Sequence, residues 1–510
     1  MKICLINPRF PLSLWDFTLC RDLSGSAFPF PPLGLATLAG LTPDSHEVVI
    51  LDENVRPLTI PKDADIVGIT GYHIQQERVF ALADELRKQG TTVAIGGPLV
   101  RSENLDLCFS HADAVFLGEA EYTWPRFIRD AEAGQMQPRY VQETLVNMPD
   151  SPLPRFDLLD LPSYSSAIIE TSRGCPHSCE FCEIPVRLGK GARMKSIDQV
   201  MAEVRSLASL GIDSIFLIDD NLTGSRRRAK ELLREIGRFV DETRHRICFS
   251  CQVTIDTARD DELLDLLEAA NMRRVFIGIE TPRQASLADA HKDQNQLVDL
   301  MDAVRKIQSR NIIVWGAFIV GFDADDQDIF DEQFDFIQQA AIPVAMVGIL
   351  QALPGTQLYE RVRKEGRLRK DDAGGIRSEA NDLTETNIEP KNMTAGQLVE
   401  GYRRLVRLLY EPEAFGRRLM HALLLGAGRP VKGSSPVTGK GIFTLLRILR
   451  YYLLTADLQR MRMFLRVIFG TLRHHPEQIQ TALMHLVVYK HLRLVYEQGT
   501  SRPRTDTGTP

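Results

Sequence analysis

The sequence has no long apolar run. Nowhere in its 510 residues do about 18 consecutive apolar residues occur, the length that a transmembrane helix needs. The apolar stretch near the N-terminus, Lys2–Ile6, is too short for the core of a signal peptide and predicts a buried strand. The formal charge of −6 is small for this length, so no global field favours a nucleic acid partner. We expect a cytoplasmic protein without a transmembrane helix.

Cysteine is also scarce, with 8 residues in 510. That number is too low for a disulfide framework, and nothing marks the chain as secreted. The composition, 44% hydrophobic and 25% charged, is ordinary for a globular protein. A chain of this length has room for two to four domains with sizeable cores.

Three of the cysteines stand close together. Cys175, Cys179 and Cys182 have the spacing Cys-x3-Cys-x2-Cys. Three thiolates can bind three irons of a [4Fe-4S] cluster, which leaves the fourth iron open to another ligand. A zinc site is the first alternative, but it commonly needs a second Cys or His pair and none follows; His177 inside the loop is the one extra candidate ligand. A disulfide is the second alternative.

With Phe181 directly before the last cysteine, this loop resembles the signature of the radical S-adenosylmethionine (SAM) enzymes. The resemblance implies that the open iron chelates the amino and carboxylate groups of SAM. It further implies that the reduced cluster cleaves SAM to a 5′-deoxyadenosyl radical. An enzyme of this kind needs a reducing partner such as flavodoxin or ferredoxin.

Residues 1–145 alternate between patterns typical of strands and of helices. The predicted strands are Lys2–Ile6, His46–Leu51, Ile66–Ile69, Thr92–Ile95 and Ala114–Leu117, and the predicted helices are Leu33–Leu41 and Gln75–Lys88. Repeated units of this kind predict an α/β fold, a doubly wound parallel sheet that binds ligands beyond the carboxyl ends of its strands. The residues expected at that edge are Asn7, Thr70, Gly71, Gly96, Gly97, Gly118 and Glu119. Glycines there let a bulky ligand approach the backbone, although Gly96-Gly97 is equally typical of a plain turn.

Such a domain directly before the cysteine loop resembles the cobalamin-binding domain of B12-dependent radical SAM proteins. The resemblance implies that Thr70, Gly96 and Gly97 contact the nucleotide tail of cobalamin. The Asp-x-His-x-x-Gly motif, whose His ligates cobalt in other cobalamin domains, is absent, because the loop after the first strand is Asn7–Pro11. We therefore expect cobalt without a protein His ligand, and we interpret His73 as a pocket or surface residue.

Residues 146–165 are rich in proline and predict a linker. Residues 166–360 alternate again and predict a partial (β/α)6 barrel, whose active site lies at the C-terminal ends of the strands. The predicted strands are Ala167–Glu170, Ser214–Ile218, Ile247–Val253, Arg274–Ile279, Ile312–Val320 and Val344–Leu350. The predicted helices between them are Ile197–Leu210, Ala229–Val240, Asp261–Ala270, Leu297–Arg310 and Asp328–Ala340.

Polar residues follow the barrel strands where an active site is expected. Asp220 and Asp323 are candidates for it, and both also suit helix N-caps. Glu280 is the stronger candidate, because a carboxylate that ends an apolar strand is costly without a partner. The resemblance implies that Gly278 and Glu280 contact SAM and that Gly316–Gly321 lines its adenine, although Asp323 stands where the family has Glu. Gln252 completes the set of expected cofactor contacts, and we interpret Cys248 and Cys251 as small buried apolar residues.

The C-terminal part divides into an extension at 361–425, a linker at 426–441, a basic helical segment at 442–496 and a tail at 497–510 that is expected to be disordered. Within the extension, a polar stretch at 364–381 is expected to form a loop over the barrel mouth. Between Ile442 and Arg493 the basic segment has eight Lys or Arg against two acids. Its apolar stripes suit either a helical bundle packed on the barrel or a peripheral membrane surface.

From the cysteine loop through Tyr410, the chain resembles cobalamin-binding radical SAM proteins of the hopanoid C-2 methylase type, and the N-terminal domain extends the match. The residues that carry this match are Arg9-Phe10, Pro31–Leu35, Ser172–Glu183, Phe318–Asp323, Ala345–Gly348 and Gly401-Tyr402. The resemblance implies methylation of an unactivated carbon on a lipid or other apolar small molecule. A radical SAM cyclase or rearrangement enzyme, an RNA-modifying radical SAM enzyme and a cobalamin or cluster sensor remain as alternatives.

Overall fold

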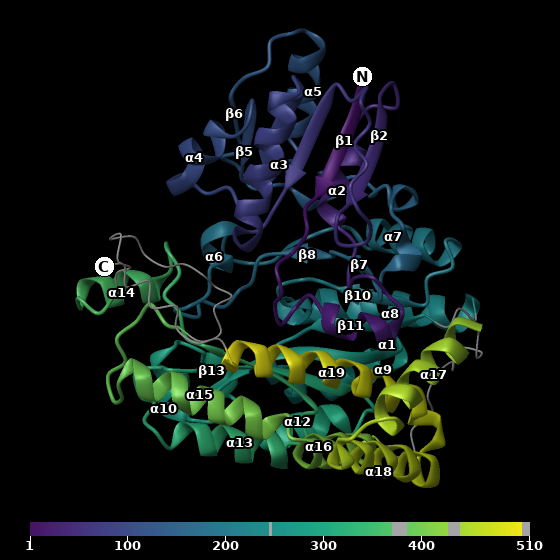
Figure 1. The fold of residues 1–510 in the computed structure, drawn as a ribbon, viewed down its shortest axis with the longest axis vertical. Helices are drawn as coiled ribbons and strands as arrows, with labels where there is room; N and C mark the ends of the chain where they lie inside the picture. Colours follow the sequence, from purple (N-terminus) through teal and green to yellow (C-terminus); the bar gives the residue numbers. More distant parts are fainter. Residues whose placement is uncertain (244–246, 370–384, 427–438, 502–510) are drawn as a thin grey trace. The chain divides into compact units, whose positions relative to one another are not determined.

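A computed structural model describes residues 1–243, 247–369, 385–426 and 439–501, and the chain divides into two compact units (Figure 1). The first unit comprises Met1–Leu12, Ser26–Pro176 and Ile184–Gln252. The second comprises Ser13–Gly25, His177–Glu183 and Val253–Pro510. The boundary passes through the cysteine loop, so Cys175 belongs to the first unit and the other two cysteines of the motif to the second.

The first unit contains a six-stranded parallel sheet with the strand order β2-β1-β3-β4-β5-β6. Its strands are β1 (Lys2–Asn7), β2 (Glu47–Asp52), β3 (Ile66–Thr70), β4 (Thr92–Gly96), β5 (Ala114–Leu117) and β6 (Arg139–Val141). Its helices are α2 (Leu33–Leu41), α3 (Gln76–Lys88), α4 (Leu105–Ser110) and α5 (Thr123–Glu132). Side chains of α3 and α4 form one apolar core with the sheet, and α5 packs Trp124 on Phe116 of the sheet. This is the predicted doubly wound fold.

The second sheet is the predicted partial barrel, with the strand order β14-β13-β12-β11-β10-β7. Its strands are β7 (Ala167–Ile169), β10 (Ser214–Leu217), β11 (Cys248–Gln252), β12 (Met272–Glu280), β13 (Ile313–Val320) and β14 (Val344–Ile349). The helices between and after them are α7 (Ile197–Ser209), α8 (Arg226–Thr243), α9 (Asp261–Ala269), α12 (Leu300–Gln308), α13 (Ile329–Gln339) and α14 (Gln357–Lys364). Short elements that the sequence did not predict are α1 (Arg21–Ser24), β8 (Ser172–Arg173), α6 (Ile184–Arg187), β9 (Arg193–Met194), α10 (Gln284–Asp289) and α11 (Asp293–Gln296).

In the described part of the chain, five helices follow the barrel. They are α15 (Ala395–Leu409), α16 (Pro412–Leu425), α17 (Gly439–Leu453), α18 (Leu458–His474) and α19 (Ile479–Ser501). Proline at the first position of α16 separates it from α15, because proline suits a helix start and not its interior. Helix α19 extends into the segment predicted as a tail. Most of the predicted loop at 364–381 and of the linker at 426–441 lies outside the described residues.

The described helices include none that is long and apolar enough to cross a bilayer. Helices α15 and α19 instead supply tyrosines that cover the exposed edge of β14. The Tyr410 hydroxyl accepts from the Ala345 N–H and donates to its carbonyl, at 3.2 and 2.7 Å. The Tyr496 hydroxyl accepts from the Val347 N–H at 3.0 Å. These contacts satisfy backbone groups that an edge strand otherwise leaves unpaired.

A buried histidine attaches α19 to the barrel. Nε2 of His485 accepts a hydrogen bond from the Trp315 indole at 3.1 Å, while Nδ1 lies 2.8 Å from the Thr481 carbonyl. The proton must therefore be on Nδ1, and a second proton on Nε2 would face the indole N–H. Burial lowers the pKa of His485 to about 4.

We predict that the stability of the second unit falls at acid pH because His485 is buried in its neutral form. In the unfolded chain a histidine takes up a proton near pH 6.5, whereas folded His485 stays neutral down to about pH 4. Its stabilising contribution is thus present above pH 6.5 and is lost as the pH falls towards 4, by up to about 3 kcal/mol. Urea unfolding at pH 7 and pH 4.5 should show a smaller loss for His485→Gln than for the parent, with the exposed His474→Gln as the control. Equal losses in all three proteins would contradict the assignment.

Candidate functional site

In the first unit, the residue before the cysteine loop is bound by three carboxylates. The Arg173 guanidinium lies 2.8 Å from Glu119, 2.7 Å from Glu121 and 2.8 Å from Glu170. Arg193 is 2.9 Å from Glu119 on its other side. Burial raises the pKa of Glu170, and the charge of Arg173 acts against that rise. Glu119 was expected at a ligand edge, but its oxygens are already engaged by two arginines.

Two aspartates at the end of β10 hold the backbone that leads into the first cysteine. Asp219 accepts hydrogen bonds from the backbone of Thr171, at 2.8 Å, and of Ser172. Burial raises the pKa of Asp219 to about 7. Asp220 accepts from the Gly174 N–H at 2.8 Å. Asp220 therefore positions the cysteine loop instead of capping a helix.

Gly174 makes the turn into Cys175. Its φ is +89°, and a Cβ atom there would lie 2.4 Å from the Gly191 carbonyl oxygen. Only glycine fits such a position without displacing backbone. The Gly191 N–H in turn donates to the Cys175 carbonyl at 3.1 Å. The hairpin of β8 and β9 therefore fixes the backbone position of the first cysteine of the motif.

In the second unit, a buried ion pair lies beside the other two cysteines. Nζ of Lys292 is 2.7 Å from Oε1 of Glu280 and 5.8 Å from the ring centre of Phe181. Burial alone would lower the pKa of Lys292, but the charges of Glu280, Cys179 and Cys182 outweigh it, and the pKa is raised. A buried ammonium facing these thiols suits an anionic thiolate cluster.

The backbone at Glu280 is unusual for a non-glycine residue. Its φ is +64°, and the pairing of β12 with β13 shifts register between Gly278 and Glu280. A Cβ at Gly278 would lie 2.3 Å from Oε1 of Glu280 and 3.0 Å from Nζ of Lys292. The Asn295 amide donates to the Gly278 carbonyl at 3.1 Å, and Gln333 donates to the Glu280 carbonyl at 3.2 Å. These hydrogen bonds hold the strained backbone of Glu280 in place, and such strain is typical of functional sites.

The segment Gly316–Gly321 at the end of β13 lies near the cysteine loop, whereas Asp323 does not have the role of a helix cap that its sequence position suggests. Gly321, with φ +102°, donates to the buried Asp325 at 2.9 Å, and Phe322 packs edge-on against Phe181 at 6.0 Å between ring centres. The motif therefore reaches the cysteine loop. Asp323 does not act as a helix cap, because it forms ion pairs with three cations. These are Arg361, Arg367 and Lys391.

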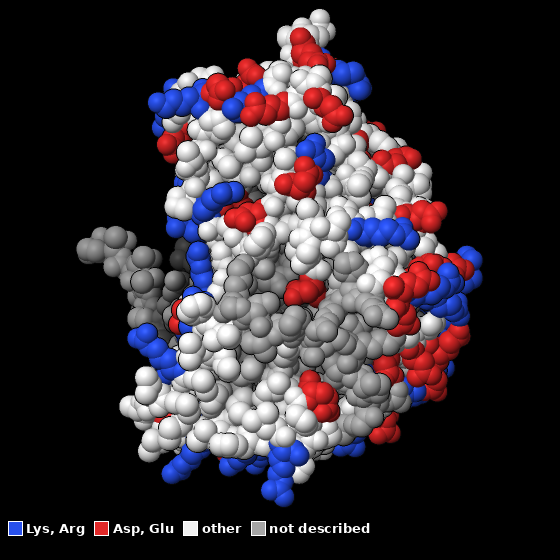
Figure 2. Space-filling model, turned by 90° about the vertical axis from the view of Figure 1, so that its right-hand side faces the viewer, with Lys and Arg blue, Asp and Glu red and all other residues white. Residues whose placement is uncertain are grey.

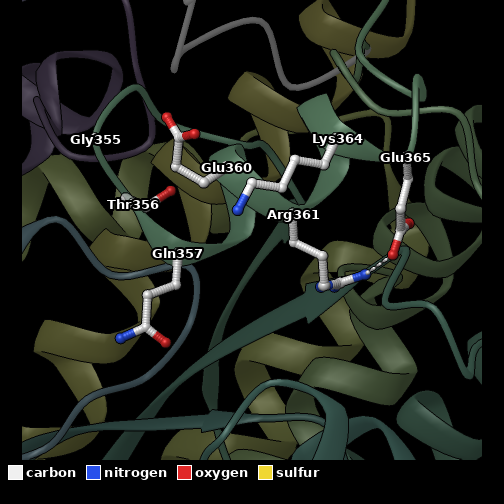
Figure 3. A pocket seen from close by; sticks show the side chains of 7 residues that line it. All are labelled: Gly355, Thr356, Gln357, Glu360, Arg361, Lys364 and Glu365. Atoms are coloured by element: carbon white, nitrogen blue, oxygen red, sulfur yellow. Dashed lines mark hydrogen bonds and ion pairs between the residues drawn. The ribbon is translucent and has the colours of Figure 1, made fainter.

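A pocket of about 520 Å³ opens beside α14 (Figure 3). Charged side chains line part of it, and Arg361 points towards Glu365, 3.4 Å away. Arg361 also pairs with Glu180, which stands between two cysteines of the loop, at 2.5 Å. The pocket therefore borders the cysteine loop.

The expected ligand edge of the first sheet brings four predicted residues together. Thr70 and Gly96 are direct partners in the register of β3 and β4. Gly97 has φ +86°, and a Cβ there would lie 2.4 Å from Oγ1 of Thr70 and 3.2 Å from the backbone of Gly71. Gly118 follows β5, where a Cβ would meet the Gln142 carbonyl oxygen at 2.8 Å, so the neighbouring chain already requires glycine there.

The remaining predicted residues have less specific surroundings. Gln252 ends β11 and is half-buried, Cys251 is buried, and burial lowers the pKa of His177. All eight cysteines are described and none is in a disulfide. No group of three His, Cys, Asp or Glu in the described ranges is arranged around a single metal ion. A [4Fe-4S] cluster does not need such convergence, because each thiolate binds a different iron.

Three functional candidates escaped the sequence analysis, namely Arg173, Asp219 and Lys292. Asp219 follows a predicted strand, and its position in the sequence does not distinguish it from the neighbouring Asp220. Lys292 lies in a polar stretch without periodicity, 12 residues after Glu280. Its only signal was that a carboxylate ending a buried strand needs a nearby cation.

Comparisons with known proteins agree with this geometry. The radical SAM superfamily model matches residues 169–337, and a domain of unknown function, DUF4070, matches 356–503. The chain is similar to a protein named as an uncharacterized methyltransferase, sll1242, of Synechocystis sp., with 35% identity over 84% of this chain and 80% of that protein. It is 29% identical to the hopanoid C-2 methylase of Rhodopseudomonas palustris, over 98% and 94% of the two chains.

Solved structures share the fold. The cobalamin-dependent SAM radical enzyme OxsB, with aqua-cobalamin and SAM bound, aligns at a TM-score of 0.61 with 17% identity, covering 99% of this chain and 82% of that one. The radical SAM methyltransferase TsrM of Kitasatospora setae, with cobalamin and a [4Fe-4S] cluster bound, aligns at 0.57 with 17% identity, covering 79% and 84%. Both agree with the predicted order of a doubly wound domain before a radical SAM barrel.

Lys292 is expected to support both SAM and the cluster. Lys292→Met leaves Glu280 buried without its cation, so SAM affinity should fall roughly 10- to 150-fold, the equivalent of about 1.5–3 kcal/mol. Removing a positive charge beside Cys179 should also lower the reduction potential of the cluster. Titration with SAM and a redox titration followed by electron paramagnetic resonance measure the two effects.

The matched control is Lys364→Met, which removes an exposed lysine from α14. Glu280→Gln should weaken SAM binding in the same direction as Lys292→Met. If Lys292→Met retains its iron and keeps both the SAM affinity and the potential of the parent, the ion pair has a purely structural role.

Proposed function

This chain belongs to the radical SAM superfamily, in one family with the Synechocystis methyltransferase, and on that basis we propose that it is a cobalamin-dependent methylase of an unactivated carbon in an apolar small molecule. The observation that carries the proposal is the buried Lys292–Glu280 pair beside Cys179, because it supplies fixed charge where SAM and a cluster would meet. The names and cofactors of the similar proteins support the methyl transfer.

Each part of the site has a defined task in this proposal. Cys175, Cys179 and Cys182 hold the cluster, and Glu280 with Lys292 orients SAM. When bound, the cluster supplies the electron that cleaves SAM, and cobalamin carries the methyl group. The protein's own contribution is to bind these groups, align them and exclude water.

Cobalamin fits the edge formed by Thr70, Gly71, Gly96 and Gly97. Thr70 and Gly96 pair at the carboxyl ends of β3 and β4, the edge at which sheets of this kind bind ligands. The loop after β1 has no histidine to offer to cobalt.

We propose a lipid-like substrate because the hopanoid C-2 methylase aligns over almost the whole chain. Identity of 29% does not determine the substrate, since fold and cofactor leave it open. The electron donor is proposed to be a flavodoxin or ferredoxin, and the unbridged cysteines support a reducing, cytoplasmic setting. We propose no nucleic acid partner.

Methyl transfer is tested by anaerobic reconstitution with cobalamin, candidate polycyclic lipids and SAM that carries a deuterated methyl group. We expect a product heavier by the labelled methyl, together with 5′-deoxyadenosine, by mass spectrometry. Cys175→Ala, Cys179→Ala and Cys182→Ala should each abolish both products, while Cys108→Ala, a buried cysteine of the first unit, should not. Deoxyadenosine with a product that lacks the label would indicate a cyclase or rearrangement enzyme instead.

Cobalt is expected to have no nitrogen ligand from the protein. Electron paramagnetic resonance of the Co(II) state should lack the splitting that an axial nitrogen produces, and His73→Ala should leave the spectrum unchanged. Nitrogen splitting that disappears in His73→Ala would place that histidine on cobalt and contradict the prediction.

A further inference from the structure

Helix α17 is apolar on both of its faces. Its inner face carries Ile448 and Tyr452, which are 1% and 0% exposed. Tyr452 stacks on Phe464 of α18, with ring centres 4.8 Å apart, and donates a hydrogen bond to the Leu486 carbonyl of α19 at 2.6 Å. These contacts hold the helix in the second unit, so its outer face is not needed for folding.

The outer face of α17 is apolar although it faces solvent. At 100° per residue, its members cluster on the side of the helix opposite Ile448. They are Ile442, Phe443, Leu446 and Leu453, with Leu454 directly after the helix, and they are 50%, 65%, 55%, 37% and 79% exposed. A contiguous patch of large apolar side chains on a surface marks an interaction site.

The charge around this patch is of one sign. Arg450 lies within the outer face and Arg447 at its margin, and both are exposed. Residues 441–474 contain six arginines and a single acid, Asp457. That acid is already engaged, because it accepts from the Arg460 N–H and pairs with Arg493 at 3.1 Å. In Figure 2 the lower left part of the surface is largely white, with Lys and Arg side chains along the lower edge, and Asp and Glu side chains lie in the lower middle and at the lower right.

Several cations of the basic segment expected from the sequence have partners within the protein. Arg460 lies over the ring of Tyr451, Arg466 pairs with Glu413, and Lys490 pairs with Asp22. Helices α18 and α19 therefore behave largely as a packed bundle. Helix α18 also exposes Leu458, Phe469 and Leu472, and α17 with Leu454 exposes the larger apolar face. The cations of α17, Arg447 and Arg450, have no carboxylate partner among the described residues.

We propose that the outer face of α17 binds the surface of an anionic lipid bilayer, with its apolar side chains at the level of the acyl chains and Arg447 and Arg450 at the phosphates. Helices with this division of apolar and basic residues lie in the bilayer interface. A second copy of the chain suits the face less well, because a two-fold contact would bring the arginines of one copy against those of the other. The proposal does not depend on the proposed reaction.

The test uses the full chain and vesicles of phosphatidylcholine with or without phosphatidylglycerol. We expect co-sedimentation with the anionic vesicles that weakens as salt rises. Phe443→Ser/Leu454→Ser should reduce the partition coefficient at least about ten-fold. Arg450→Gln should reduce it about five-fold, the equivalent of about 1 kcal/mol for a cation near an anionic surface.

Matched controls change residues of similar exposure elsewhere. These are Leu153→Ser/Leu210→Ser for the apolar pair and Arg227→Gln for the arginine. All variants should keep the parent's circular dichroism and melting temperature. Equal vesicle binding by parent and Phe443→Ser/Leu454→Ser would overturn the proposal. So would a parent that dimerises in solution, loses the dimer on this double substitution and does not bind vesicles.

Discussion

The ion cluster around Arg173 is the interaction on which the first unit's contribution to the site depends. One guanidinium binds carboxylates at the end of β5, in the turn after it and at the end of β7, so it joins the two sheets within that unit one residue before the cysteine loop begins. Burying such a cluster adds little net stability, because desolvation offsets the attraction. Its effect is on geometry, since removing one partner would leave a buried charge uncompensated at a cost of about 3–5 kcal/mol.

The second unit also contains a buried ion pair, but with a single carboxylate in place of three. Glu280 is held in a left-handed backbone conformation by the bulge in β12, and Lys292 compensates its charge. Each unit therefore holds a cation among carboxylates beside its own part of the cysteine motif, Arg173 in the first and Lys292 in the second. In the second unit Gln294 also donates to Sγ of Cys179, at 3.5 Å. Contacts of this kind offset the cost of placing charge among buried groups.

Most strands of the two sheets were predictable from the sequence because they contain short apolar runs, as β1 and β3 do, which are buried at nearly every position. Ala114–Leu117 and Leu33–Leu41 match their predictions at both ends. The short strands β6, β8 and β9 carry no such run and were missed. The sequence also placed Glu280 at the site because a carboxylate after an apolar run stands out. It did not identify Lys292 as the partner, because pairing between loops depends on tertiary structure and leaves no periodic signal.

The position of α17 depends on tertiary contacts that the periodicity of its own sequence does not predict. Residues Ser13–Gly25 leave the loop after β1 and pack in the second unit, where Phe17 lies against His491 and Asp22 pairs with Lys490. The end of this excursion reaches α17, because Thr444 donates to the Ser24 carbonyl at 3.4 Å and the Arg447 guanidinium lies against Gly25. A surface helix would ordinarily turn its largest apolar stripe inwards. Here the inner positions are occupied by Ile448 and Tyr452, and the contacts with Ser24 and Gly25 fix the rotation of the helix. Phe443 and Leu454 consequently face outwards because of packing on the inner side, which leaves the outer face free to evolve as a binding surface without a cost to the fold.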